Sequence, residues 1–345
     1  MKYLNLLKKY WLLFLIIFAL LLGYFLNLLP RPKAPSLEIP KTTPIPTIPI
    51  TSLPTINTGF TSPNQITWRL TKLDLPKKLP VLHIALPKSD PTVYFPAAKA
   101  FGLTSNPTKI PNLPIIVFNS PDNSGDFYVN LKDRLAKFQI NLDVKPLPQT
   151  GTKRTPDDFL NQLTTTLTPI LNLPTAFSLR SNGFEYETIN GEGFTAADQT
   201  QANLIQITLN YEYNHLPIKY RGLPTVTAKY SLYGPLISLS YALPPSDIQP
   251  SPDYSLKTFN EIKQTPANQF EIVNISGNLN FTLSDQNEII KSTTITDGYL
   301  GYLMSPNSTT ITPYVFFTGT SQSKIYGPLT VTLATPTLKL PNQNP

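Results

Sequence analysis

The chain has 345 residues, enough for two or three domains of ordinary size. It contains no cysteine and only two histidines, which excludes disulfides, thiolate metal sites and a metal site built from several histidines of one chain. The formal net charge of +7 is concentrated at one end: residues 1–63 hold six basic residues and one acidic residue, and the rest of the chain holds 22 and 20. This distribution favours contact with anionic lipid headgroups over binding of nucleic acid.

The N-terminal segment predicts a membrane anchor. Residues 10–29 read YWLLFLIIFALLLGYFLNLL, without a charge and apolar on every side. A helix of this length spans about 30 Å, the thickness of a hydrocarbon core. A cleaved signal peptide is the alternative, but the apolar run is long for one and no small-residue cleavage site follows. We therefore expect a single-pass cell-membrane protein, with residues 1–9 in the cytoplasm, residues 10–29 in the bilayer and the bulk of the chain extracytoplasmic.

A proline-rich segment follows the predicted anchor. Residues 30–63 contain nine prolines, which leave no room for a helix. Such a run favours extended polyproline II structure, at about 3.1 Å per residue. We interpret residues 30–63 as a stiff stalk; a ligand for a proline-recognising partner is the alternative.

Residues 64–150 carry the signals of a first α+β module. The stretch PVLHIAL (80–86) predicts a strand, and PAAKAFGL (96–103) predicts a short helix that ends at Gly102. Residues 113–131 predict a hairpin whose turn lies at 121–125.

Residues 151–249 begin with a helix signal and continue with strand signals. Thr155 is a predicted N-cap, Pro156 suits the first helical position, and Asp157 and Asp158 complement the helix dipole. The alternating strand-like runs then lie at 184–189, 203–213, 225–233 and 235–243. A helix followed by strands with short connections predicts one helix packed on an antiparallel sheet.

Residues 250–345 repeat parts of this pattern. The tetrapeptide YGPL occurs at 233–236 and again at 326–329, each time before an alternating apolar run. Phe184 and Glu185 match Phe270 and Glu271 at an offset of 86, and later matches drift to an offset of 93. A drifting offset is typical of a duplicated domain with loop insertions. The predicted fold class is therefore α+β: an N-terminal transmembrane helix followed by tandem small modules, 64–150, 151–249 and 250–345, each a helix on an antiparallel sheet.

The segment LNYEYNHLPIKYRG (209–222) resembles PepSY/FTP-type modules, in which a long strand turns tightly into the next strand. The layout of the chain also resembles the membrane-anchored YycH/YycI-type regulators of a cell-wall sensor kinase. This resemblance implies a regulatory or interaction role without catalysis.

The same segment supplies the candidate partner-binding residues, which combine aromatic rings with cationic side chains: Tyr211, Tyr213, His215, Lys219, Tyr220 and Arg221. Rings on a sheet face beside cations can hold sugar rings or a partner's side chains. Ordinary cross-strand packing of the tyrosines is the alternative.

Few residues suggest catalysis. Ser321 and Lys324 in SQSK have the spacing of a serine acyl-transfer nucleophile and its base, but the accompanying motifs of that chemistry are missing. We predict no catalytic residues, no metal and no cofactor. The leading hypothesis is a non-catalytic binding or regulatory protein that presents its modules to an envelope protein partner. The alternatives are a cell-wall or glycan-binding stalk and, more remotely, an envelope hydrolase.

Overall fold

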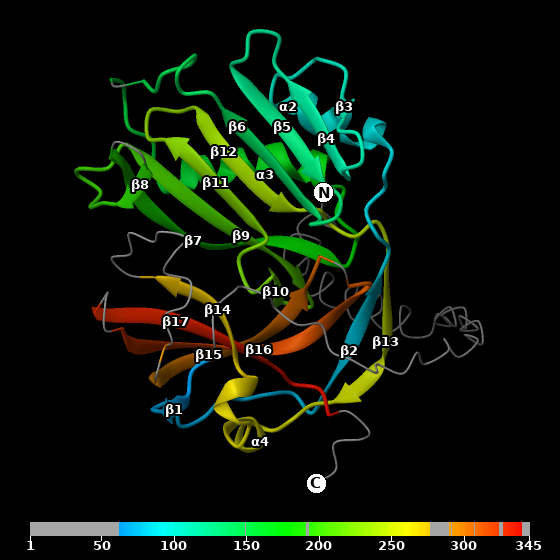
Figure 1. The fold of residues 1–345 in the computed structure, drawn as a ribbon, viewed down its shortest axis with the longest axis vertical. Helices are drawn as coiled ribbons and strands as arrows, with labels where there is room; N and C mark the ends of the chain where they lie inside the picture. Colours follow the sequence, from blue (N-terminus) through cyan, green and yellow to red (C-terminus); the bar gives the residue numbers. More distant parts are fainter. Residues whose placement is uncertain are drawn as a thin grey trace, which may run out of the picture. The chain divides into compact units, whose positions relative to one another are not determined.

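The computed structural model describes residues 62–148, 150–190, 193–276, 290, 292–306, 308–323 and 327–339. All of them belong to one compact unit, residues 47–345. The strands of this unit are linked by hydrogen bonds into one continuous sheet (Figure 1), in which we distinguish a helix-covered region and a C-terminal region.

The helix-covered region is an antiparallel run of nine strands in the order β3-β4-β5-β6-β12-β11-β9-β7-β8. The bounds of these strands are β3 Thr108–Lys109, β4 Ile115–Asn119, β5 Gly125–Asn130, β6 Leu135–Ile140, β7 Phe177–Asn190, β8 Gly193–Ala196, β9 Leu204–Tyr213, β11 Val226–Ser231 and β12 Leu236–Ala242. Most strands that follow one another closely in sequence are antiparallel neighbours in the sheet, because short hairpin turns can connect them.

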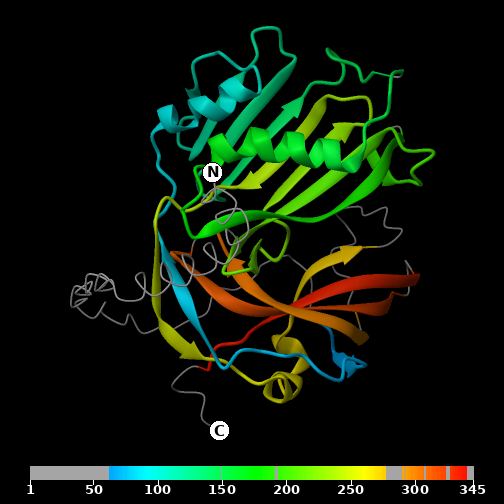
Figure 2. The ribbon, with the colours of Figure 1, turned by 180° about the vertical axis from the view of Figure 1, so that it is seen from behind.

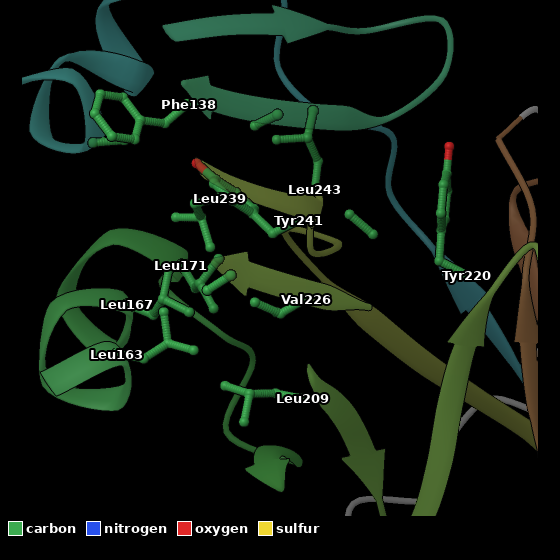
Figure 3. Close-up of a cluster of buried hydrophobic side chains, with 14 of the residues drawn as sticks. Phe138, Leu163, Leu167, Leu171, Leu209, Tyr220, Val226, Leu239, Tyr241 and Leu243 are labelled. Atoms are coloured by element: carbon green, nitrogen blue, oxygen red, sulfur yellow. The ribbon is translucent and has the colours of Figure 1, made fainter. Parts of the chain in front are cut away.

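The helix α3 (Pro156–Leu171) covers one face of this region (Figure 2). It begins with a capping box, in which the Thr155 hydroxyl and the Asp158 carboxylate satisfy each other's backbone N–H groups. Its buried residues recur every four positions and therefore lie on one side of the helix: Phe159, Leu163, Leu167 and Leu171. Figure 3 shows the last three pointing toward Leu239 and Val226 of the sheet. The shorter elements η1 (Pro91–Tyr94) and α2 (Phe95–Ala100) also belong to this region, and α2 ends before Gly102 as predicted, with φ +76° at that glycine.

The other face of the helix-covered region is polar. Gln206, Thr208 and Asn210 alternate along β9 with buried apolar residues. Residues directly opposite in antiparallel strands share a face, so Thr227 and Lys229 of β11 join Thr208 and Gln206 on the polar side.

The C-terminal region is built on two long strands, β15 (Ser292–Met304) and β16 (Thr310–Ser323). β17 (Gly327–Pro336) and then β14 (Glu271–Ser276) extend it on one side. On the other side, β1 (Gln65–Trp68) and β10 (Leu216–Tyr220) lie parallel to the two ends of β15.

Two further elements complete the C-terminal region. β2 (Lys78–Ile84) pairs with the start of β16 and with β13 (Ile248–Ser255). α4 (Phe259–Lys263), followed by η2 (Ala267–Gln269), covers an aromatic core, where Trp68 contacts Phe259, Phe270 and Phe317 at ring distances of 5.7, 6.0 and 5.0 Å.

The predicted fold class is wrong, because the tandem modules are not separate. β6 pairs with β12 from Gln139–Ser238 to Leu135–Ala242, so strands from 64–150 and 151–249 form one sheet with one core. β10, from 151–249, pairs in parallel with β15, and β2, from 64–150, pairs with β13. Residues 250–345 are therefore hydrogen-bonded to both earlier parts. The prediction of separate PepSY-like modules is wrong for the same reason, because these pairings join the predicted modules.

The duplication fails at the level of topology. In residues 151–249 the strands follow the order β7-β9-β11-β12, so the first long strand pairs with the next one. In residues 250–345 the first described strand after α4, β14, pairs with the last described strand, β17. Phe184 is 51% exposed whereas Phe270 is fully buried, so the two matched residues occupy different environments.

The membrane prediction is also corrected. Within the part of the chain that the structure describes, no helix has the length and apolarity needed to cross a bilayer. The predicted tail (1–9), span (10–29) and stalk (30–63, apart from its last two residues) lie outside that part. The structure therefore does not support the predicted single-pass location in a membrane.

Candidate functional site

The middle of β7 is an exposed sheet edge. Its six consecutive residues 180–185 are all solvent-exposed, although β9 pairs with them on one side. On the opposite side, the described strands leave residues 177–185 uncovered, because β8 pairs only with 187–190. A bulge between Ser181 and Gly183 interrupts the register, and Gly183 has a φ of +120°, which favours glycine. Such an edge presents unpaired backbone groups to another chain.

A cleft of about 610 Å³ lies beside this edge. Its walls come from β7, β9, β10 and β11, from the loop after β10, and from β14, β15 and β17. Most of the lining side chains are amides, hydroxyls or aromatic rings: Asn182, Phe184, Gln206, Thr208, Thr227, Asn274, Ser276, Tyr299 and Thr332. Two charged side chains, Lys219 and Glu185, also line it.

Lys219 is the buried cation of the cleft. It is 4% exposed, and its Nζ donates a hydrogen bond to Asn182 Oδ1 at 3.1 Å. The Nζ also lies 5.7 Å from the centre of the Tyr299 ring. Burial lowers the pKa of Lys219 from its ordinary value near 10.5 to about 8. Among the described residues, Lys219 forms no ion pair. Its ammonium group therefore has donors left for a ligand's oxygen atoms.

Two asparagines hold this lysine in place. Asn210 Nδ2 donates to Asn182 Oδ1 at 2.8 Å, so that one oxygen accepts from both Asn210 and Lys219. The Oδ1 atom of Asn210 is buried and has no hydrogen-bond partner among the described residues. A buried acceptor without a partner is unfavourable. The Lys219–Asn182–Asn210 cluster thus combines an available cation with an available acceptor.

Two further pairs of opposite charges lie on the polar face. Lys229 pairs with Glu187 at 2.7 Å, and Arg180 pairs with Glu212 at 3.1 Å. Glu185 lies further along β7, toward β8, and is exposed. The cleft therefore offers a positive point at Lys219 and a negative, solvated one at Glu185.

The structure separates the six residues predicted for partner binding. Tyr211, Tyr213 and Tyr220 are buried; the Tyr211 hydroxyl donates to the carbonyl of Ala242. Burial raises the pKa of Tyr211 well above its ordinary value. These rings match the alternative of cross-strand packing and leave no face for a partner.

The remaining three of the six residues lie in different places. His215 is exposed in the two-residue β9–β10 turn, where both Asn214 and His215 have positive φ values. Arg221 forms an ion pair with Asp133 at 2.6 Å. Of the six, only Lys219 lines the cleft.

The sequence prediction missed Asn182, Asn210 and the cleft walls. The strict alternation of Gln206, Thr208, Asn210 and Glu212 along β9 was a signal of a polar face. Nothing local in the sequence shows that β14 and β17 border this face.

The SQSK motif considered for catalysis lies only partly within the described residues. Ser321 is buried, and its hydroxyl donates to the carbonyl of Ser292 at 2.6 Å; Lys324 lies outside the described residues. The groups of acidic and histidine residues within the described ranges include none that could hold a metal ion.

Comparison with known proteins adds little to this site. No family model and no curated protein matches the chain. Among solved structures, an uncharacterized protein from Eubacterium rectale is similar, with a TM-score of 0.42 and 9% identity over 75% of this chain and 82% of that chain. The resemblance to YycH/YycI-type regulators stays a prediction from the sequence.

Proposed function

We propose that this chain is a non-catalytic binding protein that holds an extended segment of a protein partner along the outer edge of β7. The run of six exposed residues, 180–185, in a strand that is paired on its other side carries this proposal. An added strand would form main-chain hydrogen bonds with this edge, while the neighbouring cleft would take its alternate side chains. The exposed ring of Phe184 offers apolar contact at the same place.

The partner segment carries an acidic residue. Lys219 stands at the cleft wall without a carboxylate partner, and its burial makes a new ion pair there stronger than one at an open surface. A carboxylate that accepts from Lys219 would lie next to Asn182, the exposed residue that begins the bulge in β7. The acidic residue therefore fixes the register of the added strand.

Site-specific crosslinking tests this proposal. A photo-crosslinking phenylalanine analogue replaces Phe184, and the matched control replaces Leu113, an apolar residue with similar exposure before β4. We expect a light-dependent polypeptide adduct from position 184 in the producing cells and none from position 113. Mass spectrometry of the adduct then gives the captured segment, which should contain Asp or Glu within a few residues of the crosslink.

A synthetic peptide of the captured segment provides the decisive measurement. We expect Lys219→Met to weaken its binding about tenfold or more, because a charge-assisted hydrogen bond is lost. Lys137→Met removes a cation from the same face, farther along the sheet on β6, and should leave the affinity unchanged. Equal adducts at positions 184 and 113, or a peptide affinity that Lys219→Met does not change, would refute the proposal.

An acidic oligosaccharide is the second candidate ligand. Amide and hydroxyl groups beside the Tyr299 ring are the side chains that proteins use for sugar hydroxyls and sugar faces. This candidate predicts binding of a uronic-acid oligosaccharide that Tyr299→Ala abolishes, together with no polypeptide adduct from position 184. The two candidates therefore give opposite results in the crosslinking experiment.

A further inference from the structure

A second site is suggested by Arg134, which precedes β6, a strand separated from β7 by β12, β11 and β9 in the sheet. Arg134 ends the turn between β5 and β6, and its side chain is completely buried. Its φ of +52° lies in the left-handed region, where a residue other than glycine or asparagine is uncommon. Turn formation alone does not favour arginine at this position.

The guanidinium group of Arg134 is only partly satisfied by the protein. Nη1 donates to the carbonyl of Ser308 at 2.9 Å, in the connection between β15 and β16. Nε and Nη2 are shielded from solvent and have no acceptor in the part of the chain that the structure describes. A buried guanidinium stays protonated, so both its charge and these N–H groups need compensation.

No described carboxylate supplies that compensation. The adjacent acidic residue, Asp133, is engaged by Arg221 Nη2 at 2.6 Å and by the side chain of Asn130 at 2.8 Å. The ion pairs between described residues do not include Arg134. Asp133, Arg134 and Arg221 together thus carry one excess positive charge.

Two buried hydroxyl groups, of Tyr220 and Ser305, also lack hydrogen-bond partners among the described residues. Tyr220 interacts electrostatically with both Arg134 and Arg221, and its buried hydroxyl makes no hydrogen bond within the described ranges. Figure 3 shows its ring standing apart from the leucine cluster. Ser305 follows Met304, which pairs with Tyr220, and its buried hydroxyl is likewise without a partner. Arginine N–H groups together with hydroxyl donors are the groups that bind a small anion.

We propose that a small inorganic anion binds between the β5–β6 turn and the β15–β16 connection, held by Arg134 with the hydroxyls of Tyr220 and Ser305. An anion neutralises the guanidinium, which a water molecule cannot do. Since the site joins the helix-covered region to the C-terminal region, the bound anion stabilises the junction between them. The proposal is independent of partner binding at β7.

Thermal unfolding of the full chain tests the site with chloride as the probe. Chloride is raised while sodium gluconate keeps the ionic strength constant. Above the dissociation constant, we expect the unfolding midpoint to rise by about 2–4 °C for each tenfold increase in chloride. Arg134→Met should abolish this dependence, whereas Lys132→Met, which removes an exposed cation of the same turn, should retain it.

Crystals soaked in bromide decide the question if Arg134→Met fails to fold. An anomalous peak within hydrogen-bond distance of the Arg134 guanidinium is the expected result. A midpoint that does not respond to chloride, a response that persists in Arg134→Met, or a water molecule and no bromide beside Nη2 would overturn the proposal.

Discussion

The two halves that resemble each other in sequence, residues 151–249 and 250–345, build their sheets differently. Both contain a helix with a Thr capping box. In both, a Gly-Pro pair lies immediately before or at the start of the last long strand. Yet the first described strand after the helix pairs with the next long strand in one half, and with the last described strand in the other. Similar local signals therefore produce similar elements, while the long-range contacts of each strand decide where it pairs.

The largest expected difference between the halves concerns the matched residues Phe270 and Phe184. Phe270→Ala should lower the free energy of unfolding by about 3–5 kcal/mol, because it leaves a cavity beside Trp68 and Phe317. Phe184→Ala should change it by no more than about 0.5 kcal/mol, because that ring is exposed. Urea unfolding of both variants measures the two values, and equal losses would restore the idea of two equivalent copies.

Local elements were predictable from the sequence because their causes are local. Thr155 and Asp158 lie three residues apart, and that spacing forms the observed capping box of α3. The alternation along 203–213 gives β9 with the buried and polar faces that it predicts. These features depend on neighbours within one turn of helix or two residues of strand.

Pairing order and the candidate site were not predictable in the same way. β12 pairs with β6, which lies about 100 positions earlier in the chain, and β14 pairs with β17, which lies about 60 positions later. No residue pattern within β12 or β14 specifies which edge it joins, since many edges accept an alternating strand. Lys219 was proposed from its aromatic neighbours, but its environment comes from Asn182 on another strand.

The second difference concerns two lysines that border the polar face, Lys219 and Lys229. Lys219 lacks a carboxylate partner, so Lys219→Met should raise the free energy of unfolding at pH 7 by roughly 1–2 kcal/mol, after subtraction of its lost hydrogen bond. Lys229 is paired with Glu187, so Lys229→Met should lower the free energy of unfolding by about 1–3 kcal/mol.

The pH dependence of the Lys219 effect follows from its pKa. The folded chain has a pKa of about 8 at this lysine, whereas the unfolded chain keeps the ordinary value near 10.5. Between these values the unfolded state binds more protons, so the contribution of Lys219 to stability becomes more favourable as pH rises. The advantage of Lys219→Met over the wild type should therefore shrink from pH 8 to pH 10.5. Chemical denaturation at each pH measures the difference in free energy of unfolding between the variant and the wild type. A difference that stays constant across this range would mean that burial does not destabilise the charged form of Lys219.

The smallest difference is expected between the two capping boxes. Thr155 caps a helix of 16 residues and Thr258 caps one of 5, and in each the Thr hydroxyl accepts from the N3 backbone N–H at 3.3 Å. Thr155→Ala and Thr258→Ala should each lower the free energy of unfolding by about 1 kcal/mol, because a cap satisfies backbone groups of the first turn only. Thr155→Ser and Thr258→Ser keep the hydroxyl and serve as controls. If Thr155→Ala were several times more damaging than Thr258→Ala, the effect of the cap would depend on helix length, and the first turn would not act independently of the later turns.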